Sequence, residues 1–171
     1  FTFIGTAQPE LDEQRQKLEE FENRQTSLEA EQAEVHQAIQ KTKLKILQLE
    51  LKAMGTPTGV EGEVVWHEAM VLSYNEQHEQ ANWVFHKIHE DIADGNFTRS
   101  NDFRVDPRVS TGTAEQKDYF LVSKDDKGKK VYDGFGYDRG HLAPSADFRW
   151  HAKALSESYF YSNMSPQDPD L

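Results

Sequence analysis

The apolar and polar positions of this chain follow two different periods. From residue 10 to residue 54 apolar residues recur at helical spacing, and the stretch contains neither Pro nor Gly. This pattern predicts one continuous α-helix. Pro9 and the acidic residues after it favour a helix start, and Gly55-Thr56-Pro57 favours its end. At the usual rise per residue the helix would be about 65 Å long.

A heptad repeat runs through this predicted helix. With position a at residue 11 and position d at residue 14, nine of the thirteen seam positions are apolar. The exceptions are Gln14, Gln25, Gln32 and Thr42. The repeat favours a coiled coil, with a homodimer as the expected assembly. The alternative is a single long helix that lies against its own domain. Three further leucines widen the apolar surface near its end, where we expect contact with the following domain: Leu44, Leu47 and Leu51.

After residue 62 the apolar positions follow the shorter period of β-strands. Residues 69–74 and 82–88 are predicted to pair as an antiparallel hairpin. Three later segments are predicted as a strand, a turn and a returning strand: 119–123, 125–128 and 131–132.

The end of the chain is predicted as a helix, a strand and a loop, over residues 147–158, 159–163 and 164–171. The resulting organisation has four parts. They are a tail (1–9), a coiled-coil helix (10–54), a linker (55–61) and an α+β domain (62–171).

Composition places the packed core in the last of these parts, because all three Trp and all six Tyr occur at or after residue 66. The net charge of −11 disfavours a polyanion partner, since phosphate attraction supplies most non-specific affinity for nucleic acid. A local Arg cluster or a bound cation can offset that charge. The chain has no Cys, which excludes disulfides and thiolate metal sites, and no apolar run of transmembrane length.

The stretch Tyr137–Pro144 holds the strongest candidate chemistry. Phosphodiester cleavage needs a base to activate water and positive charge on the phosphate, and Asp138, Arg139 and His141 offer both within four residues. Gly140 between them is expected to let the chain turn and a ligand come close. Taken alone, a His at a strand end is more often structural.

A pair of histidines elsewhere in the chain, His86 and His89, is a weaker candidate for a metal site. The two residues do not share a face as a helical pair would, so a metal site there is disfavoured.

Several blocks around the motif resemble the DNA/RNA non-specific endonucleases, the ββα-metal group that includes endonuclease G. In chain order the blocks are Ser73–Asn75, Asn82–Val84, Arg99–Phe103, Asp106–Arg108, Asp138–Pro144, Asp147-Phe148 and Tyr161–Gln167. The resemblance covers residues 72–171 and implies an α+β nuclease domain with an antiparallel sheet. The predicted coiled coil lies outside it.

The resemblance implies a role for each matching residue. His141 would be the general base that takes a proton from the attacking water, with an acceptor fixing its other ring nitrogen. Arg139 and Arg99 would contact the scissile phosphate. Asp138 would orient the Arg or a metal-bound water, or hold the turn as a buried ion pair. Asn163 would position groups around the phosphate.

The resemblance also implies Mg²⁺, or Mn²⁺, held by a single Asn with water in the other positions. By the family pattern this Asn would follow Leu171 directly, so no metal ligand is expected within the chain itself. A later Glu, the α element and about the second half of the sheet would lie beyond it too. The chain by itself is therefore expected to be a fragment without strong nuclease activity.

These observations predict an Mg²⁺-dependent endonuclease that hydrolyses phosphodiester bonds of DNA and RNA and leaves a 5′-phosphate. One alternative is a nuclease-like protein that binds nucleic acid or another partner without cutting and is oligomerised by its coiled coil. Another is a scaffold in which the helix itself is the main function. Non-specific nucleases are dangerous in the cytosol, so the resemblance, with Phe1 as first residue, favours a periplasmic or secreted protein.

Overall fold

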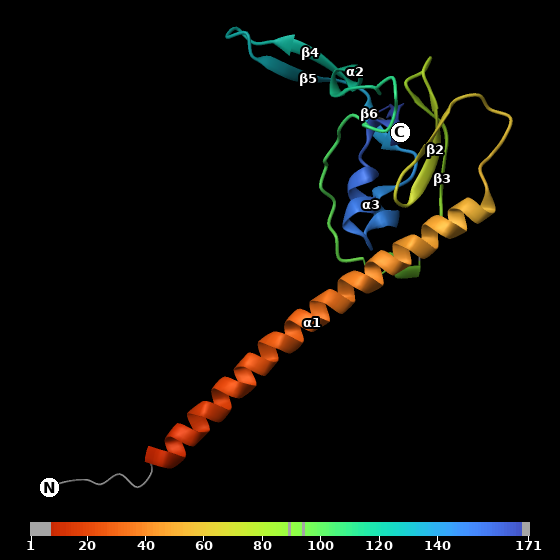
Figure 1. The fold of residues 1–171 in the computed structure, drawn as a ribbon. Coiled ribbons are helices and arrows are strands. Elements are labelled where there is room, and N and C mark those ends of the chain that lie inside the picture. The colour runs from red at the N-terminus through yellow and green to blue at the C-terminus, as the bar shows by residue number, and fades with distance from the viewer. Residues whose placement is uncertain (1–7, 89, 94, 169–171) are drawn as a thin grey trace. The chain divides into compact units, whose positions relative to one another are not determined.

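The computed structural model describes residues 8–88, 90–93 and 95–168. The chain divides into two compact units, Phe1–Lys43 and Leu44–Leu171. The described residues form an α+β fold, with one long helix followed by short antiparallel sheets and short helices (Figure 1). Most of the predicted tail, residues 1–7, lies outside the described residues.

Helix α1 (Gln8–Met54) is unbroken over 47 residues. It ends where predicted, since Gly55 adopts a φ of 75° that favours glycine after a helix. Residues 8–39 are all exposed. Polar side chains one turn apart support the helix locally, as between Lys17 and Glu13 at 2.5 Å.

The last turns of α1 belong to the second unit and pack into its core. Leu44, Leu47 and Leu51 are buried there, as the extra leucines predicted. Their neighbours include Met70, Ala143, Phe148, Trp150, Leu155 and Tyr159. The helix end therefore completes the hydrophobic core of the second unit.

A three-stranded antiparallel sheet forms the first half of this unit. It consists of β1 (Glu63–Trp66), β2 (Met70–Asn75) and β3 (Gln80–His86), in that order. The predicted hairpin is present, with Leu72 opposite Val84. Strand β2 is buried from Met70 to Tyr74, so it forms the centre of the core.

Two smaller antiparallel pairs follow in the chain. Strands β4 (Phe120–Lys124) and β5 (Lys130–Gly136) form the predicted hairpin, preceded by the short helix α2 (Gln116–Tyr119). Strand β6 (Asp138–His141) pairs with β7 (Met164–Gln167).

The prediction of a strand at 159–163 and a loop after it was wrong. Residues Tyr161–Asn163 form the single turn η3, and the strand begins at Met164. The apolar run 159–161 is buried because it lies in the core, whereas β7 exists because it pairs with β6 more than twenty residues earlier.

The helix predicted over 147–158 is also shorter. A 3₁₀ turn, η2 (Ser145–Phe148), precedes helix α3 (Ala152–Glu157). His151 stands outside α3 as its N-cap and accepts a hydrogen bond from Ala154 N through Nδ1 at 3.3 Å. A single turn, η1 (Glu90–Ile92), lies further upstream.

A buried polar network ties the segment around residue 106 to the rest of the second unit. The Asp106 carboxylate accepts a hydrogen bond from Ser162 Oγ at 2.5 Å and lies 3.0 Å from His67 Nε2. Glu157 of α3 accepts from Arg108 at 3.1 Å and from the backbone N–H of Glu68 at 2.7 Å. This network fixes α3 and η3, which precede the strand that pairs with the motif.

Candidate active site

The motif residues lie on β6, and β7 holds that strand in place. Gly140 faces Ser165 and His141 faces Met164 in the antiparallel register. A Cβ at Gly140 would lie 2.8 Å from Gln167 Oε1 and 3.2 Å from Ser165 O. Gly140 therefore permits close approach of β7, and the turn predicted for it was wrong because Gly140 lies within strand β6.

His141 sits in an aromatic pocket. Its ring centroid lies 5.1 Å from that of Tyr159, edge to face, and 5.7 Å from that of Phe103. Its Nε2 atom is enclosed and has no hydrogen-bond partner in the described part of the chain. The acceptor predicted for the second ring nitrogen is therefore not found at Nε2.

Two arginines flank this histidine. The guanidinium of Arg139 lies over the rings of Phe103 and Phe120, at 3.7 and 5.1 Å from the centroids. The Nε of Arg99 donates a hydrogen bond to Asn101 Oδ1 at 3.0 Å, and Arg99 is exposed. The aromatic rings beside Arg139 and the amide of Asn101 beside Arg99 thus hold the two guanidinium groups without neutralising their charge.

These surroundings lower the pKa of His141 to about 4. Burial disfavours the charged imidazolium, and the positive charges of Arg99 and Arg139 disfavour it further. His141 is therefore neutral at pH 7 and able to accept a proton.

Asn163 lies behind the site and is fully buried. Its amide Nδ2 donates to Ala143 O at 3.0 Å and to Ser158 O at 2.8 Å, while its Oδ1 accepts from Ala143 N at 2.9 Å. Both amide donors are thus occupied by backbone. Asn163 therefore holds the segment that follows His141.

Asp138 is exposed at the start of β6. Adjacent strand residues point to opposite faces, so Asp138 and Arg139 diverge. Among the described residues the structure forms no ion pair between them, and the buried pair considered from sequence is not observed, since Asp138 is exposed and Arg139 lies over Phe103.

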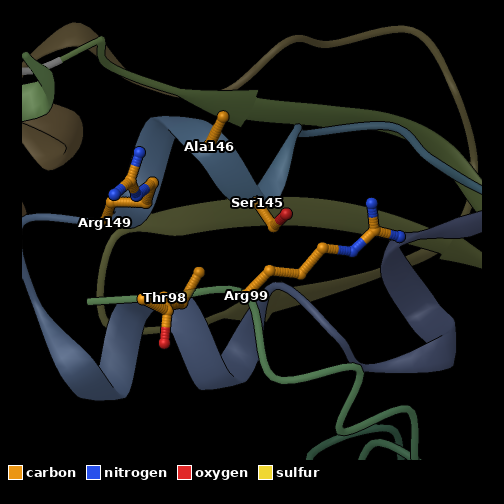
Figure 2. A pocket seen from close by; sticks show the side chains of 6 residues that line it. Thr98, Arg99, Ser145, Ala146 and Arg149 are labelled. Carbon is orange, nitrogen blue, oxygen red and sulfur yellow. The ribbon is translucent and has the colours of Figure 1, made fainter.

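A pocket of about 320 Å³ opens next to the motif. Figure 2 shows the Arg99 side chain running past Ser145, with Arg149 on the other side of the pocket. Thr98 and Ala146 complete the labelled lining. Sequence reasoning missed Arg149, Ser145 and Thr98, although Arg149 follows the family block Asp147-Phe148 by one residue.

His86 of β3 meets η2 beside this pocket. Its Nε2 lies 2.9 Å from Asp147 Oδ2, so the family block containing Asp147 is tied to the hairpin. The disfavoured metal pair with His89 cannot be compared, because His89 lies outside the described residues.

No group of three or more His, Asp or Glu side chains suited to a metal ion occurs among the described residues. The residues present therefore do not fit a complete metal site. None of the helices in the described ranges combines the length and apolar character needed to cross a bilayer.

Comparison with known proteins defines the class. Residues 47–171 match the model of the DNA/RNA non-specific endonuclease family. The chain belongs to this family, which consists of metal-dependent nucleases. The matched region includes Arg99, Arg139, His141 and Asn163.

Particular relatives support the same assignment. The chain is 34% identical to human mitochondrial endonuclease G over 105 residues, which is 61% of this chain and 31% of that protein. It is 35% identical to a nuclease of Nostoc sp. over 99 residues, 58% of this chain and 32% of the other. The chain thus spans about a third of the length of these relatives.

A solved structure shares the fold. A chain in the crystal structure of the EndoG/EndoGI complex, which describes EndoG inhibition, superposes with a TM-score of 0.51 at 30% sequence identity. The match covers 64% of this chain and 41% of that chain.

Proposed function

We propose that this protein is an endonuclease that hydrolyses phosphodiester bonds of DNA and RNA, with His141 as the general base. The observation that carries the proposal is the neutral imidazole of His141 between Arg99 and Arg139, inside the segment matched by the family. A neutral base next to paired cations suits attack by water on an anionic phosphodiester.

The enclosure of the imidazole selects the reacting nitrogen. Because Nε2 is enclosed and the rings of Phe103 and Tyr159 pack near the imidazole, we expect Nδ1 to be the nitrogen that meets water. A bound phosphate would carry negative charge into a site that holds two arginines. That charge raises the pKa of His141 from its low value, so the base becomes stronger when substrate is present.

The arginines would bind the phosphate and stabilise the charge that develops on it. Arg139 is held by the Phe103 and Phe120 faces, which leave its N–H groups free of any carboxylate partner in the described structure. Arg99 has one contact, to Asn101, and borders the pocket next to the motif. A planar fork of donors suits a phosphate better than an ammonium group does.

Asp138 and Asn163 would act on the neighbours of the base. Asn163 fixes the backbone of Ala143, two residues after His141, and so positions the base. Exposed Asp138 is free to orient a water at the edge of β6.

We propose Mg²⁺ or Mn²⁺ as the cofactor. Its chemistry in such a reaction is to stabilise negative charge on the leaving oxygen. The described residues do not form a site for this ion. The roles proposed for them are those of the base, of phosphate binding and of positioning.

The test is cleavage of plasmid DNA and of RNA by the full-length protein. We expect His141→Ala to lower the rate at least about 100-fold, because it removes the base. The matched control is His78→Ala in the exposed turn before β3, which should cleave like the parent. Equal cleavage by His141→Ala and the parent would refute the mechanism, and unchanged cleavage in EDTA would refute the metal requirement.

A second candidate is a nuclease-like protein that binds without cutting. The net charge of −11 favours the form of it that binds a protein partner, since that charge weakens association with nucleic acid. Under this alternative the full-length protein would bind nucleic acid or a protein partner and show no cleavage in either metal.

The oligomeric state is also part of the proposal. Helix α1 exposes an apolar heptad seam, and we propose that the protein associates with itself through that seam.

A further inference from the structure

We propose that two copies of α1 pair in parallel and in register, so that each residue of the seam faces its own counterpart. The inference rests on the proposed self-association and not on nuclease activity. It follows from which side chains of α1 are exposed, which are buried, and how charges flank the seam.

The large exposed apolar residues of α1 all fall on one heptad seam, apart from the terminal Met54. Their exposed fractions run from 45% to 67%. They are Leu11, Leu18, Phe21, Leu28, Val35, Ile39, Ile46 and Leu49, each at position a or d. A stripe of this length exposed to water is unfavourable, and covering it stabilises the helix by burying apolar area.

The domain of the same chain uses a different side of the helix. Leu44 and Leu51 occupy position f and Leu47 position b, and these three are the buried leucines. Ile46 and Leu49, in the same turns, stay exposed at a and d. In these last turns the seam is therefore not the surface that packs into the core of the second unit.

Charges beside the seam identify the occupant as a second copy of the chain. In a parallel, in-register pair each g residue meets the e residue five positions later on the other helix. This places Glu10 against Arg15, Lys17 against Glu22, and Arg24 against Glu29, which are all opposite charges. Each contact occurs twice by symmetry.

The remaining g-to-e contacts do not oppose this arrangement. Glu31 meets His36, and Lys45 meets Glu50, which also binds Lys87 of its own chain at 2.7 Å. No pair of like charges arises along the seam in this register.

The antiparallel arrangement brings like charges together. With the helices overlapping along their full length, Lys17 would lie against Lys45, and Glu31 against Glu31 of the second copy. Like charges flanking a seam disfavour that pairing.

The seam residues also favour two strands over three. Ile39 and Ile46 at a, with Leu28 and Leu49 at d, are the pattern typical of parallel dimers. Gln25 and Gln32 at a are polar residues in a seam, and such residues restrict register because a shifted pair would leave them against apolar neighbours.

Single cysteines test the geometry, since the chain has none of its own. Full-length Leu18→Cys and Thr42→Cys are each treated with a short bis-maleimide, alone and as an equimolar mixture after exchange. Parallel pairing predicts that each variant cross-links to itself. The two positions are about 36 Å apart along a helix, so a mixed product would require antiparallel pairing. Ala30→Cys at position f is the control and should stay uncross-linked.

Sedimentation of the same proteins separates the two ways in which the idea can fail. A monomer at all concentrations would overturn self-association itself. A dimer that cross-links only in the mixture would overturn the parallel register. Neither result depends on cleavage, so neither bears on the proposed nuclease activity.

Charge exchange tests the flanking contacts. Glu22→Lys/Glu29→Lys and Lys17→Glu/Arg24→Glu should each raise the dimer dissociation constant at least about tenfold. An equimolar mixture of the two should recover tight pairing, because every altered contact becomes attractive again. The control Glu20→Lys/Glu34→Lys changes the charge equally at position c and should pair like the parent. Failure of the mixture to recover would overturn the register.

Discussion

At the scale of single residues, His141 is defined by what surrounds its two nitrogens. Phe103 and Tyr159 pack against the ring, while Arg99 and Arg139 set the local potential. The same contacts that keep the imidazole neutral leave it a weak base in the free protein. Under the proposed function, its strength as a base would depend on the charge of the bound phosphate, and catalysis would be linked to substrate binding.

The titration of His141 is a direct test of this environment. In the folded protein we expect its NMR signals to titrate near pH 4, and Arg99→Gln to move the pKa towards the ordinary 6.5. The matched control is Arg149→Gln from the same pocket, which should leave the pKa in place. A wild-type value near 6.5 would contradict the electrostatic account.

The same shift fixes the sign of a stability change. The folded-state pKa lies below the ordinary value, so the unfolded chain takes up the proton first as pH falls. The contribution of His141 to stability is complete above pH 6.5 and is lost as pH falls towards 4. In His141→Phe this loss between pH 6.5 and 4 should be smaller than in the parent.

Asn163 provides a second prediction at this scale. Asn163→Ala would leave Ala143 N, Ala143 O and Ser158 O without their partner in the core. We expect a loss of about 2–4 kcal/mol in the free energy of unfolding, measured with urea. Exposed Asn96→Ala is the control. A loss below about 1 kcal/mol would show that the amide does not hold the segment after His141.

At the scale of elements, the site depends on β7 and on the polar network beneath it. His67, Asp106 and Ser162 are buried together, and Arg108 reaches Glu157 of α3. Burial raises the pKa of Asp106, but His67 together with the hydrogen bonds from Ser162 and the Arg108 backbone outweighs burial and lowers the pKa. This carboxylate therefore stabilises the fold above its ordinary pKa, and the contribution is lost as pH falls below that value.

Removing that carboxylate tests the network. Asp106→Ala should destabilise the protein by about 3–5 kcal/mol, because it leaves His67 and Ser162 buried without their partner. Asp126→Ala in the exposed turn of the β4–β5 hairpin should change stability by less than about 0.5 kcal/mol. Thermal or urea unfolding measures the stability of both variants. If Asp106→Ala were as stable as the parent, the network would not stabilise the fold.

At the scale of the whole molecule, the charge distribution decides how nucleic acid can bind. The chain carries a net charge of −11, while Arg99, Arg139 and Arg149 gather near the motif and the pocket. Association under the proposed function would rest on these few cations rather than on a broad basic surface. The binding surface would therefore be small and local.

The salt dependence of binding measures this surface. With EDTA present to prevent cleavage, three phosphate contacts predict a slope of about −3 for log K against log salt on duplex DNA. Arg149→Gln should reduce the slope by about 1, and Lys124→Gln on β4 should leave it unchanged. A slope steeper than about −6 would show that other basic residues carry the binding.

The sequence by itself determined the features that depend on local order. The helical period predicted α1, Gly55-Thr56-Pro57 predicted its end, and the apolar pattern predicted the β2–β3 and β4–β5 hairpins. The spacing of the blocks around Asp138–His141 indicated the family that the comparison then showed. These features are encoded by residues close in the chain, or by identities that need no coordinates.

Only the tertiary structure decided what surrounds the motif. The pairing of β6 with β7, the enclosure of His141 by Phe103 and Tyr159, and the hold of Asn163 on Ala143 join residues that lie far apart in the chain. Such contacts leave no periodic trace, because each arises from packing between distant segments. Residues 159–163 resembled a strand for the same reason, since a buried turn and a buried strand are equally apolar.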